Sequence, residues 1–191
     1  MSITRLTVPS LTLAIVLVAA CGDDPVSHSE PVDLKLKVTS GDVTGGALSV
    51  DKNVNTEAGN PYGAFVAAAQ AALGGDPGRI DVTAATLTVA PTSTGATQMG
   101  QVFAVTTDVT LVMNSGNVRF PVASHATVAA DGAGPIGFTV GFDDAAVTPA
   151  ELAGLIGGQF KVELAGPAAA AFAAAGASVD LDLAITLAAY E

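Results

Sequence analysis

The chain has 191 residues, of which 50% are hydrophobic and 13% are charged, so it can bury the core of one domain and is not a disordered protein. Seven basic side chains face eighteen acidic ones, for a net charge of −11. This balance argues against nucleic-acid binding, which needs a surface of Lys and Arg. The single cysteine excludes an internal disulfide and a cysteine-rich zinc site.

The first twenty residues have the pattern of a secretory signal peptide. Arg5 gives the start a positive charge, and the apolar run LTLAIVLVAA of residues 11–20 follows. A membrane-spanning helix needs about 20 apolar residues, about twice the length of this run. Pro9 would interrupt a longer helix. We therefore expect residues 1–20 to direct export rather than to span the membrane.

The residues around the cysteine narrow this prediction. Val18-Ala19-Ala20-Cys21 resembles the lipobox of bacterial lipoprotein precursors, in which an aliphatic and two small residues precede an invariant cysteine. The resemblance implies cleavage between Ala20 and Cys21, a diacylglyceryl group on the Cys21 sulfur and acylation of the new amine. Two or more acyl chains anchor a protein stably in a membrane. The alternative is an ordinary signal peptidase site that happens to contain a cysteine.

The mature chain would start with a short polar segment. Residues 21–31, CGDDPVSHSEP, are expected to form the lipidated Cys21 and a tether that lifts the domain off the bilayer. In enteric lipoproteins an Asp directly after the cysteine causes retention at the inner membrane, and Gly22 stands there in this chain. The resemblance thus implies a bacterial cell-envelope protein, with outer-membrane transfer permitted where the cell has two membranes. Loss of Arg5 makes the mature charge more negative, which repels an anionic lipid surface.

Residues 32–191 are expected to form a single domain of alternating strands. A hydrophobic pattern with a period of two is typical of strands with one buried face. The turn sequence Asn114-Ser115-Gly116-Asn117 predicts a hairpin over residues 102–128. A change of apolar parity at Ala84-Ala85 predicts a β-bulge. The alternating runs lie at residues 32–38, 47–50, 80–90, 102–113, 118–128, 136–142, 160–164 and 179–187.

Three short helices are expected between the strands. Asn60 precedes the first, over residues 61–73, and the capping box Thr148-Pro149-Ala150-Glu151 starts the second, which ends at Gly157-Gly158. The third covers the alanine-rich residues 167–175. Together these patterns predict an all-β fold, a mostly antiparallel β-sandwich or a barrel-like variant, with two or three short connecting helices.

One polar loop carries the candidate metal ligands. Alternating oxygen ligands are how Ca²⁺ loops are built, but the EF-hand pattern fails because Thr56 replaces its glycine. The interpretation that we favour is a polar loop whose side chains cap turns. Ca²⁺ binding, the only cofactor considered, remains the alternative. The candidate ligands are Asp51, Asn53, Asn55 and Glu57.

The candidate catalytic residues form no recognisable motif. Ser124 and His125 are neighbours on a predicted strand, so they face opposite sides and cannot form a nucleophile–base pair. His125 is expected on the polar face of the sheet. Asp143 and Asp144 follow a strand, where they would be solvated and would support the dipole of the next helix.

Three functions are compatible with these patterns. The sequence does not identify a protein or small-molecule partner for any of them. We favour a lipid-anchored envelope protein whose β-domain binds or scaffolds without catalysis and whose membrane contact is through acyl chains on Cys21. The second is a Ca²⁺-dependent binding module. The third is an enzyme whose site is scattered over loops, which a deep pocket gathering Asp143, Asp144 or His125 would support.

Overall fold

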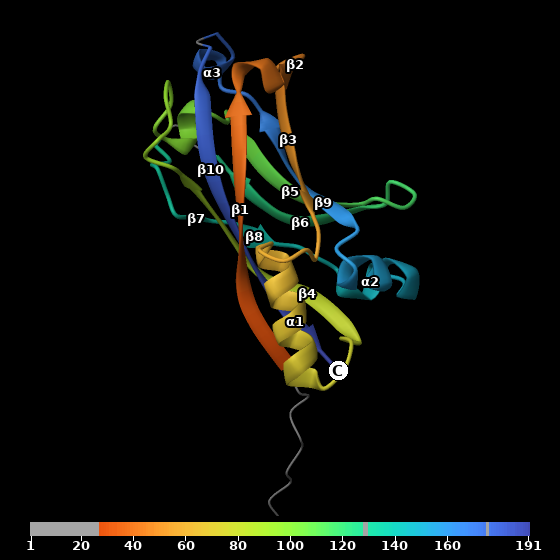
Figure 1. The fold of residues 1–191 in the computed structure, drawn as a ribbon. Coiled ribbons are helices and arrows are strands. Elements are labelled where there is room, and N and C mark those ends of the chain that lie inside the picture. The colour runs from red at the N-terminus through yellow and green to blue at the C-terminus, as the bar shows by residue number, and fades with distance from the viewer. Residues whose placement is uncertain (1–26, 128–129, 175) are drawn as a thin grey trace, which may run out of the picture.

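The computed structural model describes residues 27–127, 130–174 and 176–191. The expected signal peptide, the cleavage site between Ala20 and Cys21 and the lipidation site at Cys21 lie outside the described residues. Within them, two antiparallel sheets pack face to face over a shared hydrophobic core, and short helices connect or cover the strands (Figure 1). The predicted all-β sandwich with short connecting helices is confirmed.

The first sheet has four strands in the order β1-β10-β4-β7. They are β1 (Ser27–Thr39), β10 (Ser178–Tyr190), β4 (Arg79–Val89) and β7 (Ile136–Gly137). β1 and β10 pair over all 13 residues of each strand, with Ser27 opposite Tyr190. Their apolar side chains share the buried face, while the outer face carries ion pairs such as that between Lys35 and Asp182.

The second sheet has six strands in the order β2-β3-β9-β5-β6-β8. They are β2 (Val43–Thr44), β3 (Ala47–Val54), β9 (Phe160–Pro167), β5 (Thr106–Met113), β6 (Arg119–Ala126) and β8 (Thr139–Val140). The inner face is apolar, with Leu48, Val162 and Leu111 all buried. Ion pairs lie on the outer face, where Lys161 of β9 meets Asp51 of β3.

The first strand begins earlier than expected. β1 starts at Ser27, so residues 27–31 belong to the sheet and not to the predicted tether. His28 and Glu30 occupy the same face as Val32, and the His28 ring packs against Phe65 of the first helix at 5.9 Å. The polar composition of this stretch hides the alternation, but pairing with β10 satisfies its backbone hydrogen bonds.

The hairpin β5–β6 confirms the predicted turn, with Gly116 at φ 76° and Asn117 at φ 54°. Its first strand is shorter than expected, because the chain makes a 3₁₀ turn over Met99–Gln101 and reaches β5 only at Thr106. Val105, which lies in the alternating run expected over residues 102–113 but precedes β5, is 59% exposed. The last expected residue of the hairpin, Val128, lies outside the described residues.

Two register shifts change which side chains face the core. The shift in β4 opposite Thr186 and Leu187 confirms the predicted bulge, within a residue of its expected place. The second, between Val109 and Thr110 of β5, gives β6 one extra residue and was not predicted. Beyond it His125 lies opposite the buried Thr107, so His125 is on the inner side of the sheet, not on the polar face as expected.

The expected strand over residues 136–142 is instead divided between the sheets. β7 pairs with β4 in the first sheet, and β8 pairs with β6 in the second. Alternation therefore continues along the sequence, although the chain crosses from one sheet to the other after Gly137. Periodicity reports which side of the backbone is apolar and carries no information on the pairing partner.

Three α-helices connect the strands: α1 (Pro61–Leu73), α2 (Pro149–Ile156) and α3 (Ala170–Ala174). α1 and α2 match their predicted bounds, and the Asn60 cap and the Thr148–Glu151 capping box are both formed. α3 begins later than predicted, because Pro167 still pairs in β9 opposite Ala47. Ala175, the last residue of the predicted helix, lies outside the described residues. Over the described ranges, no helix combines the length and apolarity needed to cross a membrane.

Candidate functional site

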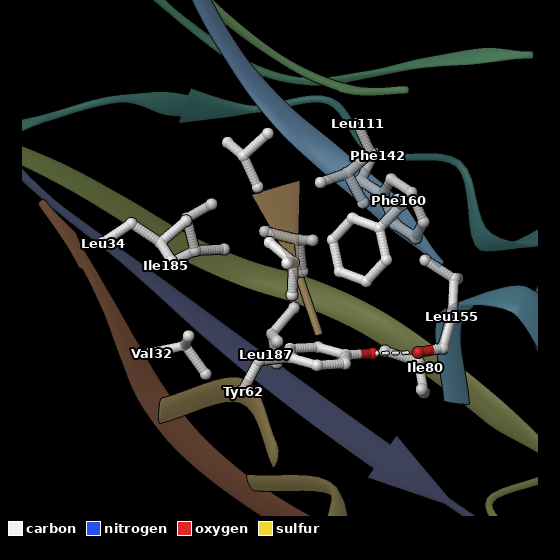
Figure 2. A pocket seen from close by; sticks show the side chains of 13 residues that line it. Val32, Leu34, Tyr62, Ile80, Leu111, Phe142, Leu155, Phe160, Ile185 and Leu187 are labelled. Carbon is white, nitrogen blue, oxygen red and sulfur yellow. Dashed lines mark hydrogen bonds between the residues drawn. The ribbon is translucent and has the colours of Figure 1, made fainter. Parts of the chain in front are cut away.

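An apolar cavity lies between the two sheets, where α1 and α2 close the space between them (Figure 2). Side chains from both sheets and both helices point into it. They are Val32, Leu34, Val54, Tyr62, Ile80, Val82, Leu111, Phe142, Leu155, Phe160, Val162, Ile185 and Leu187. The cavity has a volume of about 20 Å³, taken as the space open to the centre of a water-sized molecule.

Tyr62 brings the one polar side chain of this lining, and its hydroxyl is already bonded. It donates to the backbone carbonyl oxygen of Leu155 in α2 at 2.7 Å, a contact that Figure 2 draws. The Tyr62 ring meets Phe160 edge-on at a centroid distance of 5.0 Å. Burial raises the pKa of the Tyr62 hydroxyl well above its ordinary value, because the phenolate would lose its hydration. The hydrogen bond therefore joins α1 to α2 with a neutral phenol.

This lining can hold an apolar group but cannot carry out acid–base or nucleophilic chemistry. Its side chains are otherwise hydrocarbon, and a water molecule placed among them would find too few partners to replace its hydrogen bonds. Its space exceeds the roughly 10–15 Å³ that one water-sized molecule requires, and falls short of what a larger ligand needs. As the domain stands, the cavity admits at most a very small apolar molecule.

The candidate Ca²⁺ ligands are divided between a strand and the loop that follows it. Asp51 and Asn53 lie on β3, and the Asp51 carboxylate accepts a hydrogen bond from Lys161 Nζ at 2.6 Å. Asn55 Oδ1 accepts from the backbone N–H of Glu57 at 3.2 Å and from Asn60 Nδ2 at 3.0 Å, as turn-capping side chains do. In the described ranges no three His, Cys, Asp or Glu side chains gather as metal ligands. The Ca²⁺ site stays a prediction.

The candidate catalytic residues have separate partners. Asp143 Oδ1 accepts from the backbone N–H of Ala145 at 3.2 Å, as the cap of the short 3₁₀ helix Asp144–Ala146. Asp144 pairs with Arg79 at 2.9 Å, and His125 Nε2 lies 2.9 Å from an Asp131 carboxylate oxygen. The small hollow beside Asp144 is otherwise lined by Gly78, Arg79, Ile80, Val147 and Leu152. That hollow does not gather Asp143 or His125 with Asp144.

The cavity and the role of Tyr62 were not predicted from the sequence. Tyr62 stands at the start of α1, and helical spacing alone does not reveal which distant backbone group its hydroxyl reaches. The stacking of the Arg79 guanidinium on the Tyr190 ring, at 4.0 Å, was also missed. Both contacts join residues more than ninety positions apart in sequence. Pairing of β10 with β4 brings Arg79 to Tyr190, whereas the packing of α1 and α2 brings Tyr62 to Leu155.

No family model matches the chain, and neither the curated proteins nor the solved structures give a significant match. Its function therefore has to be inferred from the residues of this chain alone.

Proposed function

We propose that this is a lipid-anchored protein of the bacterial cell envelope, whose β-sandwich is a non-catalytic binding or scaffolding domain. The sequence Val18-Ala19-Ala20-Cys21 supports the anchor most directly. The position of the first strand agrees with it, because β1 starts at Ser27 and a folded domain can follow Cys21 after only five residues. Cleavage before Cys21 would leave every described strand and helix in the mature chain.

The contacts of the polar candidates support a non-catalytic domain. Asp51 and Asp144 are engaged in ion pairs, and Asp143 caps a helical turn. A general base or nucleophile needs a neighbour that activates it and a space for the substrate beside it. The cavity offers a space without such groups, and the Lys161–Asp51 and Arg79–Asp144 pairs lie outside it, partly exposed to solvent. We therefore assign binding or scaffolding to the outer faces and loops.

Metabolic labelling with a fatty-acid probe tests the anchor. We expect the unmodified sequence to incorporate the probe and to appear at its processed size. The variant Cys21→Ser should carry no probe and keep the precursor size, because serine cannot form the thioether. Gly22→Ala is the matched control, since it changes the neighbouring residue and keeps the lipobox, and it should be labelled normally. Equal labelling of Cys21→Ser and the unmodified protein would contradict the proposal.

A further inference from the structure

One end of the four-stranded sheet gathers residues from distant parts of the chain. Ser27 at the start of β1 lies opposite Tyr190 at the end of β10, and Tyr190 lies opposite Arg79 at the start of β4. Gly75 lies in the turn between α1 and β4. Figure 1 shows these parts together at one end, with β2 and α3 at the other. We call this end of the domain, which Ser27, Gly75, Arg79 and Tyr190 mark, the anchor-proximal end.

Chain length ties this end to the proposed lipid. Only residues 22–26 separate Cys21 from Ser27, and an extended chain spans at most about 3.6 Å per residue, so Cys21 lies within about 22 Å of Ser27. β1 has 13 residues, so its other end is about 40 Å away at the usual rise of a strand. The far end could reach the bilayer only if β1 lay along the membrane or sloped down to it from an extended tether, which would bring one flank of the domain, such as the outer face with Lys35 and Asp182, close to the lipids.

The anchor-proximal end is acidic around an uncharged centre. The last turn of α1 and the residues after it, 71–75, are Ala-Ala-Leu-Gly-Gly and carry no charge. Arg79 is offset by Asp144 at 2.9 Å, while Asp76 and Glu191 are exposed carboxylates. Like charges repel across water within about 10 Å at moderate salt. An anionic lipid surface is therefore repelled, whereas a zwitterionic surface meets no such barrier.

On the basis of the lipid anchor proposed above, we propose that the anchor-proximal end faces the bilayer and approaches zwitterionic headgroups more closely than anionic ones. The partner is the headgroup surface of the membrane that holds Cys21. The contact is held by the tether and does not require insertion of the protein. The opposite end, with β2 and α3, then projects away from the membrane.

A fluorophore on a single introduced cysteine tests this orientation. Gly75→Cys marks the anchor-proximal end, and Gly41→Cys, in the 3₁₀ turn Ser40–Asp42 after β1, is the matched control at the far end. Both glycines are exposed, and neither has a positive φ. A Cβ added at Gly75 would meet no atom within 4 Å, and one added at Gly41 would meet only Thr39 Oγ1, at 3.4 Å, so a cysteine fits at either position. Lipidation blocks the chain's only native thiol, so the added cysteine alone reacts.

The lipidated proteins are reconstituted into phosphatidylcholine vesicles that contain a lipid with a nitroxide quencher on its headgroup. We expect quenching of the fluorophore at residue 75 and none above background at residue 41, and at low salt we expect quenching at residue 75 to fall in phosphatidylglycerol vesicles. Equal quenching at both sites would overturn the orientation, and equal quenching in both lipids would overturn the lipid preference. Intact mass is measured first, so that a missing lipid, which would overturn the anchor as well, is recognised separately.

Discussion

At the scale of single residues, the alternation of buried and outward side chains along β10 has a direct energetic consequence. Leu183 is 0% exposed, whereas the next residue, Ala184, belongs to the outer face and is partly exposed. Leu183→Ala should lower the free energy of unfolding by about 2–5 kcal/mol, because it removes buried methyl groups and leaves a cavity. Ala184→Ser should cost about 0.5 kcal/mol or less. Urea unfolding of both variants measures the contrast, and equal losses would mean that both faces of the strand are buried.

Tyr62 makes a second residue-scale prediction, which depends on pH. At neutral pH Tyr62→Phe should cost about 1 kcal/mol, the usual net value of one hydrogen bond, because Leu155 O keeps the backbone N–H of Gly158 as a donor at 3.0 Å. Because burial raises the pKa of Tyr62 in the folded state, the Tyr62 hydroxyl ionises above about pH 10 in the unfolded chain while it stays neutral in the folded one. Stability from this residue is thus complete below about pH 10 and falls as the pH rises further.

The measurement is the free energy of unfolding as a function of pH for Tyr62→Phe and the unmodified domain. The variant should lose less stability than the unmodified domain above about pH 10, so the gap between the two should narrow. Tyr190 is present in both proteins and serves as the internal control. A gap that widened with pH would show that Tyr62 is not buried as a neutral phenol.

At the scale of elements, α2 depends on its first turn. Glu151 Oε2 accepts from the Thr148 backbone N–H and hydroxyl, both at 2.8 Å, and Thr148 Oγ1 accepts from the Glu151 N–H at 3.4 Å. Thr148→Ala should lower the free energy of unfolding by about 0.5–2 kcal/mol. Ala150→Ser, at an exposed neighbouring position, should change it by less than about 0.5 kcal/mol. Thermal unfolding of both variants is the measurement, and an unchanged midpoint for Thr148→Ala would exclude a stabilising cap.

The elements that could be predicted from sequence are those whose signals are local. The Asn60 cap, the Thr148 capping box and the turn at Gly116 each depend on a few adjacent residues, and all three form as expected. The start of β1 was hidden because its pairing partner is the distant β10. The division of residues 136–142 between two sheets was hidden for the same reason. Long-range pairing leaves no mark on the period of a strand.

The candidate site was less predictable than the fold. Its lining comes from both sheets, two helices and the residue Phe142, so no short motif contains it. The Ca²⁺ candidates were visible because they are adjacent, but adjacency does not decide coordination. In the folded chain Asp51 meets Lys161 from the neighbouring strand, a contact that sequence spacing does not reveal. A single sequence therefore shows candidate residues that are adjacent in the chain, but it does not show their partners on distant strands.

At the scale of the whole molecule, the chain as proposed here consists of a signal peptide, a lipidated cysteine and a β-sandwich domain. The two sheets of the sandwich pack over one hydrophobic core. Ion pairs lie on the outside of the sandwich, such as Arg119 with Glu163 and Lys161 with Asp51. The excess of acids keeps such a domain apart from anionic surfaces. In the proposed account, attachment to the membrane comes from a covalent lipid rather than from the charge of the protein.

Intact mass spectrometry of the mature protein, purified from the bacterial envelope, tests the central claim most directly. We expect a chain that begins at Cys21 and carries the added mass of a diacylglyceryl group, commonly with a further acyl chain on the amine. Treatment with trypsin should place the added mass on the N-terminal peptide, since Lys35 is the first basic residue after Cys21. An unmodified Cys21, or a chain that begins at another residue, would contradict the lipid-anchored account.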